Sequence, residues 1–313
     1  MNRDVRAESF LILTTLIWGG TFTIIKGALA DISPMLMVGI RFLLATVLSW
    51  PILIRNRRPT GNSENFQRFT PEAWLWGALI GFVMLVGYAS QTIGLKYTTV
   101  GRSGFINYSF ALFVPFLQFF FLGKKPDRGN LLGLVVVFSG LSFITGAVSG
   151  SILNGGINKG DLYSLLAALG YAFYIVLIDR AAKVIDPSVL TMMQMLFCGV
   201  FAMALVPFVE TPVLVISWRL VVAMSYLVLF GSVLALALMN WFQRRLTPLR
   251  AVLIYALEPV FAALIGWFAF HTGMSPAEIL GAVLILGGII VSDLWELLVR
   301  KFNGNHQKRS SGR

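Results

Sequence analysis

The chain has 313 residues, of which 57% are hydrophobic and only 12% are charged, and its mean hydropathy is +0.79. This composition excludes an ordinary soluble protein and is typical of a protein that crosses a membrane many times. The net charge of +11 does not indicate nucleic acid binding, because the basic residues gather in alternate loops between apolar segments.

Ten apolar segments of about the length that crosses a bilayer follow one another along the chain. They lie near residues 7–28, 34–54, 72–93, 100–122, 129–147, 160–180, 187–208, 218–241, 247–270 and 277–298. The first is longer than a typical signal-peptide core and lacks an evident cleavage site, so we expect it to be retained as a helix. The predicted fold class is an all-α integral membrane protein with ten transmembrane helices.

The distribution of basic residues predicts the orientation of these helices. Most of the 25 Lys and Arg residues lie near the two chain ends or in every second loop. Because cytoplasmic loops carry the excess of Lys and Arg, both termini are predicted to be cytoplasmic. Residues 301–313 would then form a basic cytoplasmic tail, which we expect to be disordered. We expect a multi-pass protein of the bacterial inner (cell) membrane.

The second half of the chain repeats the first. Thr99–Gly140 aligns without a gap on Thr247–Gly288. Further matches are Glu8 with Asp161, Trp18 with Tyr171, Pro34 with Pro187 and Arg41 with Gln194. Each repeat holds five spans, an odd number, so the two halves must be inverted in the membrane, as in many secondary transporters. The predicted repeats are residues 1–150, with spans one to five, and residues 151–300, with spans six to ten.

Glu258 lies near the middle of the ninth apolar segment and is followed at once by Pro259. A charged side chain at that depth costs roughly 2.5–3.5 kcal/mol on insertion scales, which indicates a function. Pro259, and Pro115 in the fourth segment, are predicted to break their helices, and such interruptions in corresponding segments point to a substrate site. Glu258 is therefore the candidate for proton coupling. A structural polar contact between helices is the alternative.

Aromatic and amide side chains are predicted to line a cavity with Glu258. Tyr255 precedes it by one helical turn and would share its face, within reach of a hydrogen bond to the carboxylate. The other members are Trp18, Tyr88, Gln91, Asn107, Tyr171, Tyr174 and Asn240. A largely apolar pocket with a few polar groups uses such residues, although a single Tyr or Trp also fits a role in packing or as an interface anchor.

Two basic residues lie inside the apolar segments. Lys26 is near the outer end of span one, where it would either snorkel to the headgroups or line an outward vestibule. Arg41 lies deeper, and its repeat mate Gln194 is also polar. An internal contact is therefore expected for Arg41, and that contact would be structural or part of the vestibule.

The chain shows no set of residues that would make a membrane-embedded enzyme. Such an enzyme needs paired acids, a metal set or an activated nucleophile within the spans. Cys198 is the single cysteine, and the two histidines, His271 and His306, fall in a loop and in the tail. We therefore expect no enzymatic activity, no cofactor and no bound metal.

These features together resemble the EamA type of the drug/metabolite transporter superfamily, over roughly residues 7–298. The matching stretches are WGGTFTIIK at Trp18–Lys26, Pro34 with Arg41, GDLYSLLAALGYAFYIVL at Gly160–Leu177, TPLRAVLIYALEPVFAALIGW at Thr247–Trp267 and GAVLILGGIIV at Gly281–Val291. Members often carry Gly-Glu after spans four and nine, where this chain has Gly123-Lys124 and His271-Thr272. Any gate or contact that uses those acids cannot be carried over.

The resemblance implies a secondary transporter that works by alternating access and exports amino acids or related small metabolites. Its partners would be a small-molecule substrate and the lipid bilayer, with protons as a candidate coupling ion, no nucleic acid, and an oligomeric state that is compatible with a monomer. The alternatives are a drug or lipophile efflux protein, a lipid flippase and a passive facilitator, because an apolar cavity with little charge also suits amphipathic molecules.

Overall fold

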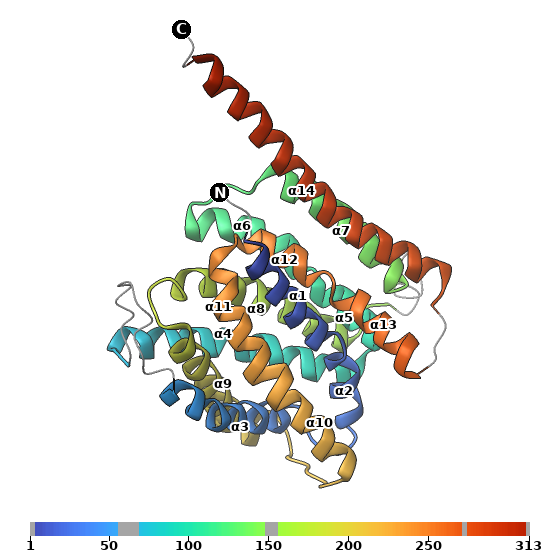
Figure 1. Cartoon of the computed structure of the whole chain (residues 1–313). Coiled ribbons are helices and arrows are strands. Elements are labelled where there is room, and N and C mark those ends of the chain that lie inside the picture. The colour runs from blue at the N-terminus through green and yellow to red at the C-terminus, as the bar shows by residue number, and fades with distance from the viewer. Residues whose placement is uncertain (1–3, 56–68, 148–155, 271–273, 311–313) are drawn as a thin grey trace.

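The computed structural model describes residues 4–55, 69–147, 156–270 and 274–310, and these residues form a bundle of helices (Figure 1). The first half contains α1 (Val5–Gly19), α2 (Thr21–Ala28), α3 (Pro34–Arg55), α4 (Pro71–Tyr97), α5 (Val100–Tyr108), α6 (Phe110–Leu122) and α7 (Arg128–Ile144). The second half contains α8 (Lys159–Ala181), α9 (Pro187–Val209), α10 (Trp218–Val228), the π-helix η2 (Leu229–Leu234), α11 (Ala235–Phe242), the short 3₁₀ helix η3 (Gln243–Arg245), α12 (Pro248–Tyr255), α13 (Glu258–Phe270) and α14 (Pro276–Ser310).

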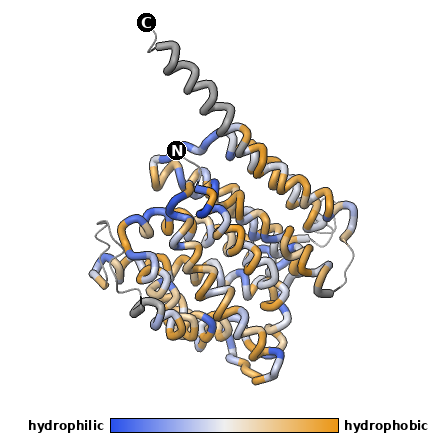
Figure 2. The backbone as a smooth tube through the Cα atoms, in the orientation of Figure 1, coloured by the Kyte–Doolittle hydropathy of each residue, from blue (hydrophilic) through white to orange (hydrophobic). Residues whose placement is uncertain are grey.

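Eight helical stretches in the described residues are long and apolar enough to cross a membrane. They correspond to eight of the ten predicted segments, and the other two appear as the shorter apolar helices Arg128–Ile144 and Pro276–Ser292. Figure 2 shows hydrophobic residues along most of the bundle, and large apolar side chains such as Phe120, 74% exposed, lie on its outside. An apolar exterior of this kind is what contact with lipid requires.

Helix α14 continues to Ser310 and extends well beyond the bundle (Figure 1). The expectation of a disordered tail from residue 301 is therefore wrong for residues 301–310. These residues include the poor helix formers Asn303, Gly304 and Asn305. They continue a helix that has already been nucleated, and adding a residue to an existing helix costs less than starting one.

Several membrane-length stretches are interrupted near their middle. The first divides into α1 and α2 at Gly20, and the ninth into α12 and α13 just before Pro259. The fourth divides at Ser109, so the break expected at Pro115 lies six residues earlier than predicted. Pro115 lies inside α6 without ending it, although it deprives the carbonyl group of Ala111 of its usual backbone donor.

Glycines bring α7 and α14 into backbone contact. A Cβ atom on Gly133 would lie 2.6 Å from the carbonyl oxygen of Gly288, and one on Gly140 would lie 2.6 Å from that of Gly281. Gly281 and Gly288 are the repeat mates of Gly133 and Gly140, so the two contacts are equivalent in the two halves. Small residues at such crossings allow membrane helices to pack closely.

An Arg residue at the start of α5 and its repeat mate at the start of α12 each form an ion pair with the start of another helix. Arg102 bonds both carboxylate oxygens of Asp161 in α8, and Arg250 Nη2 lies 3.0 Å from Glu8 Oε1 in α1. Glu8 and Asp161 are themselves repeat mates. Outside the membrane-length helices, the amide of Ala7 and the nearby Arg245 lower the pKa of Asp4 below its usual value.

Lys124, which stands where family members often have Glu, also takes part in an ion pair. Its Nζ lies 2.9 Å from Asp179 Oδ2, at the end of α8, and Lys183 lies 2.7 Å from the same oxygen. The second departure from the family pattern, His271-Thr272, lies outside the described residues.

We expect Gly140→Ala to destabilise the protein by about 1–3 kcal/mol, because the added methyl group overlaps the backbone of α14. Thermal unfolding in detergent would measure this loss. Gly287→Ala is the matched control, since a Cβ atom on Gly287 meets no atom within 4 Å. Equal melting temperatures for the two variants would contradict the close crossing.

Arg102→Met should be more destabilising than Arg102→Met combined with Asp161→Leu. The single change leaves the carboxylate of Asp161 without its cation, whereas the double change removes the unpaired charge as well. Melting temperatures of the two variants decide the point. A double variant no more stable than the single one would show that the pair does not act as described.

Candidate functional site

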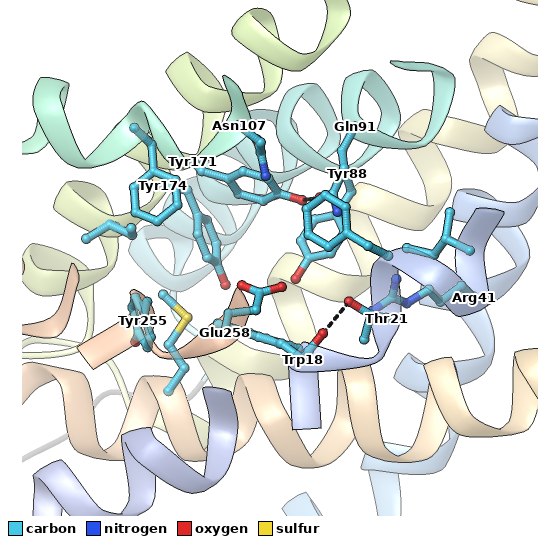
Figure 3. A pocket seen from close by; sticks show the side chains of 15 residues that line it. Trp18, Thr21, Arg41, Tyr88, Gln91, Asn107, Tyr171, Tyr174, Tyr255 and Glu258 are labelled. Atoms are coloured by element: carbon cyan, nitrogen blue, oxygen red, sulfur yellow. Dashed lines mark hydrogen bonds between the residues drawn. The ribbon is translucent and has the colours of Figure 1, made fainter. Parts of the chain in front are cut away.

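A central cavity lies at the level of the helix interruptions. It contains about 590 Å³ of space outside atoms, its open mouth included, and it is lined by Trp18, Thr21, Phe22, Ile25, Arg41, Tyr88, Gln91, Asn107, Phe110, Tyr171, Tyr174, Ile175, Met239, Tyr255 and Glu258. These residues come from α1–α6 and from α8, α11, α12 and α13. Figure 3 shows the labelled side chains converging on this space.

The structure brings together eight of the nine residues proposed from the sequence for the cavity. The exception is Asn240, which is fully buried in α11 and donates from Nδ2 to Thr191 Oγ1 at 2.7 Å. Asn240 therefore joins α11 to α9 and does not line the cavity. The preceding residue, Met239, does line the cavity, so the prediction was wrong by one position along the helix.

Aromatic rings form most of the cavity wall. The rings of Tyr88 and Tyr171 meet edge to face with centroids 5.3 Å apart, and those of Trp18 and Tyr255 are 5.6 Å apart. Phe110 lies 6.4 Å from Tyr171. Rings of this kind offer both apolar surface and π-faces that attract cations.

Several of the tyrosine hydroxyl groups are bonded within the protein. Tyr171 donates to Gln91 Oε1, and Tyr174 donates to Gln194 Oε1 at 3.2 Å. Tyr255 donates to Gln243 Oε1 at 2.9 Å, so the expected hydrogen bond from Tyr255 to Glu258 is wrong. Helix α12 ends at Tyr255 and α13 begins at Glu258. The interruption of the helix therefore removes the shared face that the spacing of the two residues implied.

Glu258 is the first residue of α13 and borders two cavities. The second cavity comprises about 800 Å³ of space outside atoms, open solvent included, and lies between the start of α5 and α13. It shares Phe22, Asn107, Phe110 and Glu258 with the central cavity. No ion pair or hydrogen bond joins the carboxylate of Glu258 to another described side chain. The start of a helix favours a negative charge, because the first backbone N–H groups point toward it.

Arg41 lines the central cavity from α3 and is only 3% exposed. Its Nε donates to Ser232 Oγ at 2.8 Å, and Nη2 donates to the carbonyl of Gly231 at 3.2 Å. Both partners belong to η2, which was not predicted from the sequence. The internal contact expected for Arg41 is thus present, and π-helical turns often occur at functional sites.

Lys26 lies away from the central cavity. Its Nζ donates to the carbonyl groups of Leu95 and Thr98, at the C-terminal end of α4. A cation at this position satisfies free carbonyl groups and complements the helix dipole. The structure therefore places Lys26 as a helix cap, which neither the snorkelling nor the vestibule interpretation anticipated.

The cavity is closed on the side where α6 meets α12. Tyr108 donates to the carbonyl of Val252 at 2.5 Å, and the amide of Leu249 donates to Gln118 Oε1 at 3.2 Å. On the other side, the second cavity continues past Gly104 and reaches Glu278 at the start of α14. The central cavity is thus packed shut toward one side of the bundle and hollow toward the other.

Sequence reasoning missed five apolar lining residues, Phe22, Ile25, Phe110, Ile175 and Met239, as well as Thr21 and the helix η2 that binds Arg41. Phe110 carried a signal, because it is the repeat mate of Glu258. Phe22, Ile25 and Ile175 carried none, since nothing distinguishes them from lipid-facing residues. Among the residues that the structure describes, no three His, Cys, Asp or Glu side chains form a group that could hold a metal ion.

Three comparisons with known proteins agree with one another. The model of the EamA-like transporter family matches residues 5–146 and again residues 158–292. A protein named as an uncharacterized transporter from Archaeoglobus fulgidus is 27% identical over 92% of this chain and 86% of its own length. The transporter YoaV of Bacillus subtilis, also named as uncharacterized, is 26% identical over 90% and 94% of the two chains. A protein of known crystal structure has the same fold, with a TM-score of 0.74 at 18% identity over 94% of this chain and 99% of its own.

Cysteine labelling would test whether the central cavity is accessible to water from the side of the second cavity only. Cys198 is fully buried, so the background is low. A water-soluble maleimide should label Gly104→Cys, in the second cavity, about tenfold faster or more than Val252→Cys, which is buried on the closed side. Equal rates, or faster reaction at position 252, would contradict the assignment of the closed side.

Proposed function

Because the chain belongs to the EamA-like transporter family, we propose that this membrane transporter moves a small molecule by alternating access through the central cavity. The observation that carries the proposal is the place of Glu258. It is a carboxylate without a bonded partner among the described residues, at a helix interruption, between a cavity that is closed on one side and a second cavity that opens on the other. Such interruptions near the middle of the membrane form the binding sites of many secondary transporters.

We further propose that the chain has ten transmembrane helices, arranged as two inverted repeats of five, residues 1–150 and 151–300. Helix α7 and the apolar part of α14, Pro276–Ser292, supply the fifth and tenth spans. Three observations support the arrangement: the equivalent glycine crossings, the equivalent ion pairs of Arg102 and Arg250, and the two separate matches to the family model.

With both termini in the cytoplasm, the side closed by α6 and α12 faces the cytoplasm, and the second cavity faces outward. The structure then represents an outward-facing state, in which cargo leaves the central cavity past Gly104 and α13. Export of amino acids or related small metabolites is our proposal for direction and cargo class, on the strength of the family resemblance. The lining itself, aromatic with a few polar groups, suits a molecule of that size.

Glu258 is the group that we propose to carry the coupling proton. A carboxyl group that faces water-accessible space on one side at a time can take up a proton there and release it on the other. Its repeat mate is Phe110, so only one half of the protein would carry the proton.

In proteoliposomes, Glu258→Gln should abolish cargo accumulation driven by a pH gradient and leave exchange without a gradient measurable. The amide keeps the shape of the side chain but cannot titrate. Glu72→Gln, a change in the exposed first turn of α4, is the matched control and should behave like the unchanged protein. Full pH-driven accumulation by Glu258→Gln would remove this residue from the coupling role.

The same preparation separates the alternative functions. Saturable cargo flux that never responds to a pH gradient would identify a facilitator, scrambling of labelled lipid would identify a flippase, and flux of lipophilic cations alone would identify a drug efflux protein. Each of these outcomes would replace the proposed proton-coupled metabolite exporter.

A further inference from the structure

We propose that the central cavity binds a dipolar molecule, with the acidic group of the ligand on Arg41 and an ammonium group of the ligand on Glu258. The inference rests on the proposed function only in taking this cavity as the cargo site. It adds the charge pattern of the cargo and the direction in which the cargo lies.

Arg41 is a buried cation without an anionic partner among the residues that the structure describes. A guanidinium group has five N–H donors, and here Ser232 and Gly231, both uncharged, accept one hydrogen bond each. The guanidinium also lies over the rings of Phe42 and Tyr88, 5.1 Å from each centroid. A buried charge held only by neutral groups and rings remains poorly compensated, and a planar bidentate donor suits a carboxylate.

Hydrogen bonds to η2 hold the guanidinium group of Arg41 in place. The carbonyl of Gly231, within the π-helix, accepts from both Arg41 and the indole N–H of Trp18. Ser232 is in turn fixed by its own hydrogen bond to the carbonyl of Leu227. Figure 3 shows Arg41 and Glu258 on different parts of the cavity wall, with Trp18 and Thr21 between them in this view. The two opposite charges therefore share one cavity without forming an ion pair.

The surroundings of Glu258 suit an ammonium group. Trp18, Tyr88 and Tyr255 present aromatic rings to the same space, and rings beside a carboxylate bind cations well. Asn107, which is 6% exposed and borders both cavities, has a side-chain oxygen without a hydrogen-bond partner. An amide with a free oxygen can accept a hydrogen bond from an N–H donor.

The charge balance of the cavity favours a ligand that carries both signs. A ligand with a single charge would satisfy Arg41 or Glu258 and leave the other without a partner of opposite charge in the cavity. A dipolar ligand satisfies both at once. The separation of the two residues then sets the length of the dipole that fits, and the aromatic wall accommodates an apolar remainder.

The test uses thermal stabilisation of the purified full-length protein by three matched sets of probes. The sets are leucine, phenylalanine and 6-aminohexanoate, each with its N-acetyl derivative, which is an anion, and its amide, which is a cation. At least one dipolar probe should bind about tenfold more tightly than both of its blocked forms, with a correspondingly larger shift in melting temperature. Failure of all three dipolar probes at about 10 mM, or equal binding of a blocked form, would overturn the proposal.

Charge-removing variants test the assigned direction. In Glu258→Gln the preference for the dipolar probe over its N-acetyl form should fall about tenfold, whereas in Arg41→Gln the preference over its amide should fall. Glu72→Gln and Arg219→Gln, both exposed, are the matched controls. If Arg41→Gln does not fold, Arg41→Lys supplies the second arm, because it keeps the charge but loses the bidentate geometry. Unchanged preferences in the folded variants would contradict the assignment.

Failure of the dipolar site can be distinguished from failure of the proposed transport function. A cation or an anion that binds and is transported would leave the protein a transporter and overturn the dipolar site. A dipolar probe that binds in detergent but never crosses proteoliposomes would keep the site and overturn transport.

Discussion

A backbone carbonyl group at membrane depth needs a hydrogen-bond donor from the protein, because lipid supplies none. This constraint organises the structure around the cavity, where several helices lose their regular hydrogen bonds. The carbonyl of Gly231 in η2 accepts hydrogen bonds from Trp18 and Arg41, and the carbonyl of Val252 accepts one from Tyr108 in addition to its bond from the amide of Ala256. Trp18 and Arg41, which line the cavity, are thus also the donors to the backbone of η2, and they can be buried because the backbone gives them partners.

The scaffold and the site differ in their symmetry. The glycine crossings of α7 with α14, and the ion pairs of Arg102 and Arg250, have equivalents in both halves. The cavity residues do not: Glu258 is matched by Phe110, and Arg41 by Gln194. A symmetric scaffold allows two similar end states on opposite sides of the membrane, whereas the single carboxylate and the single guanidinium give the cavity a polarity that a bound molecule would have to match.

The sequence was informative where a residue is out of place in an apolar segment. Glu258, Asn107 and Gln91 could be recognised because polar groups at such depth are costly. The repeat alignment also pairs Arg102 with Arg250, and their acidic partners Asp161 and Glu8 with each other. Backbone detail could not be read in this way. The π-helix in the eighth stretch has no proline or polar run to mark it, and the fourth stretch breaks at Ser109, which no proline marks. The role of Lys26 depends on where α4 ends in space, and spacing along the chain does not contain that information.

The most direct test of the account is the proton flux that accompanies cargo movement, recorded with a pH-sensitive dye inside proteoliposomes. The account predicts that cargo leaving the vesicles brings protons in, and that this proton movement vanishes in Glu258→Gln while slow cargo exchange persists. Cargo movement by the unchanged protein with no proton flux at all, or proton flux that survives loss of the carboxylate, would contradict it.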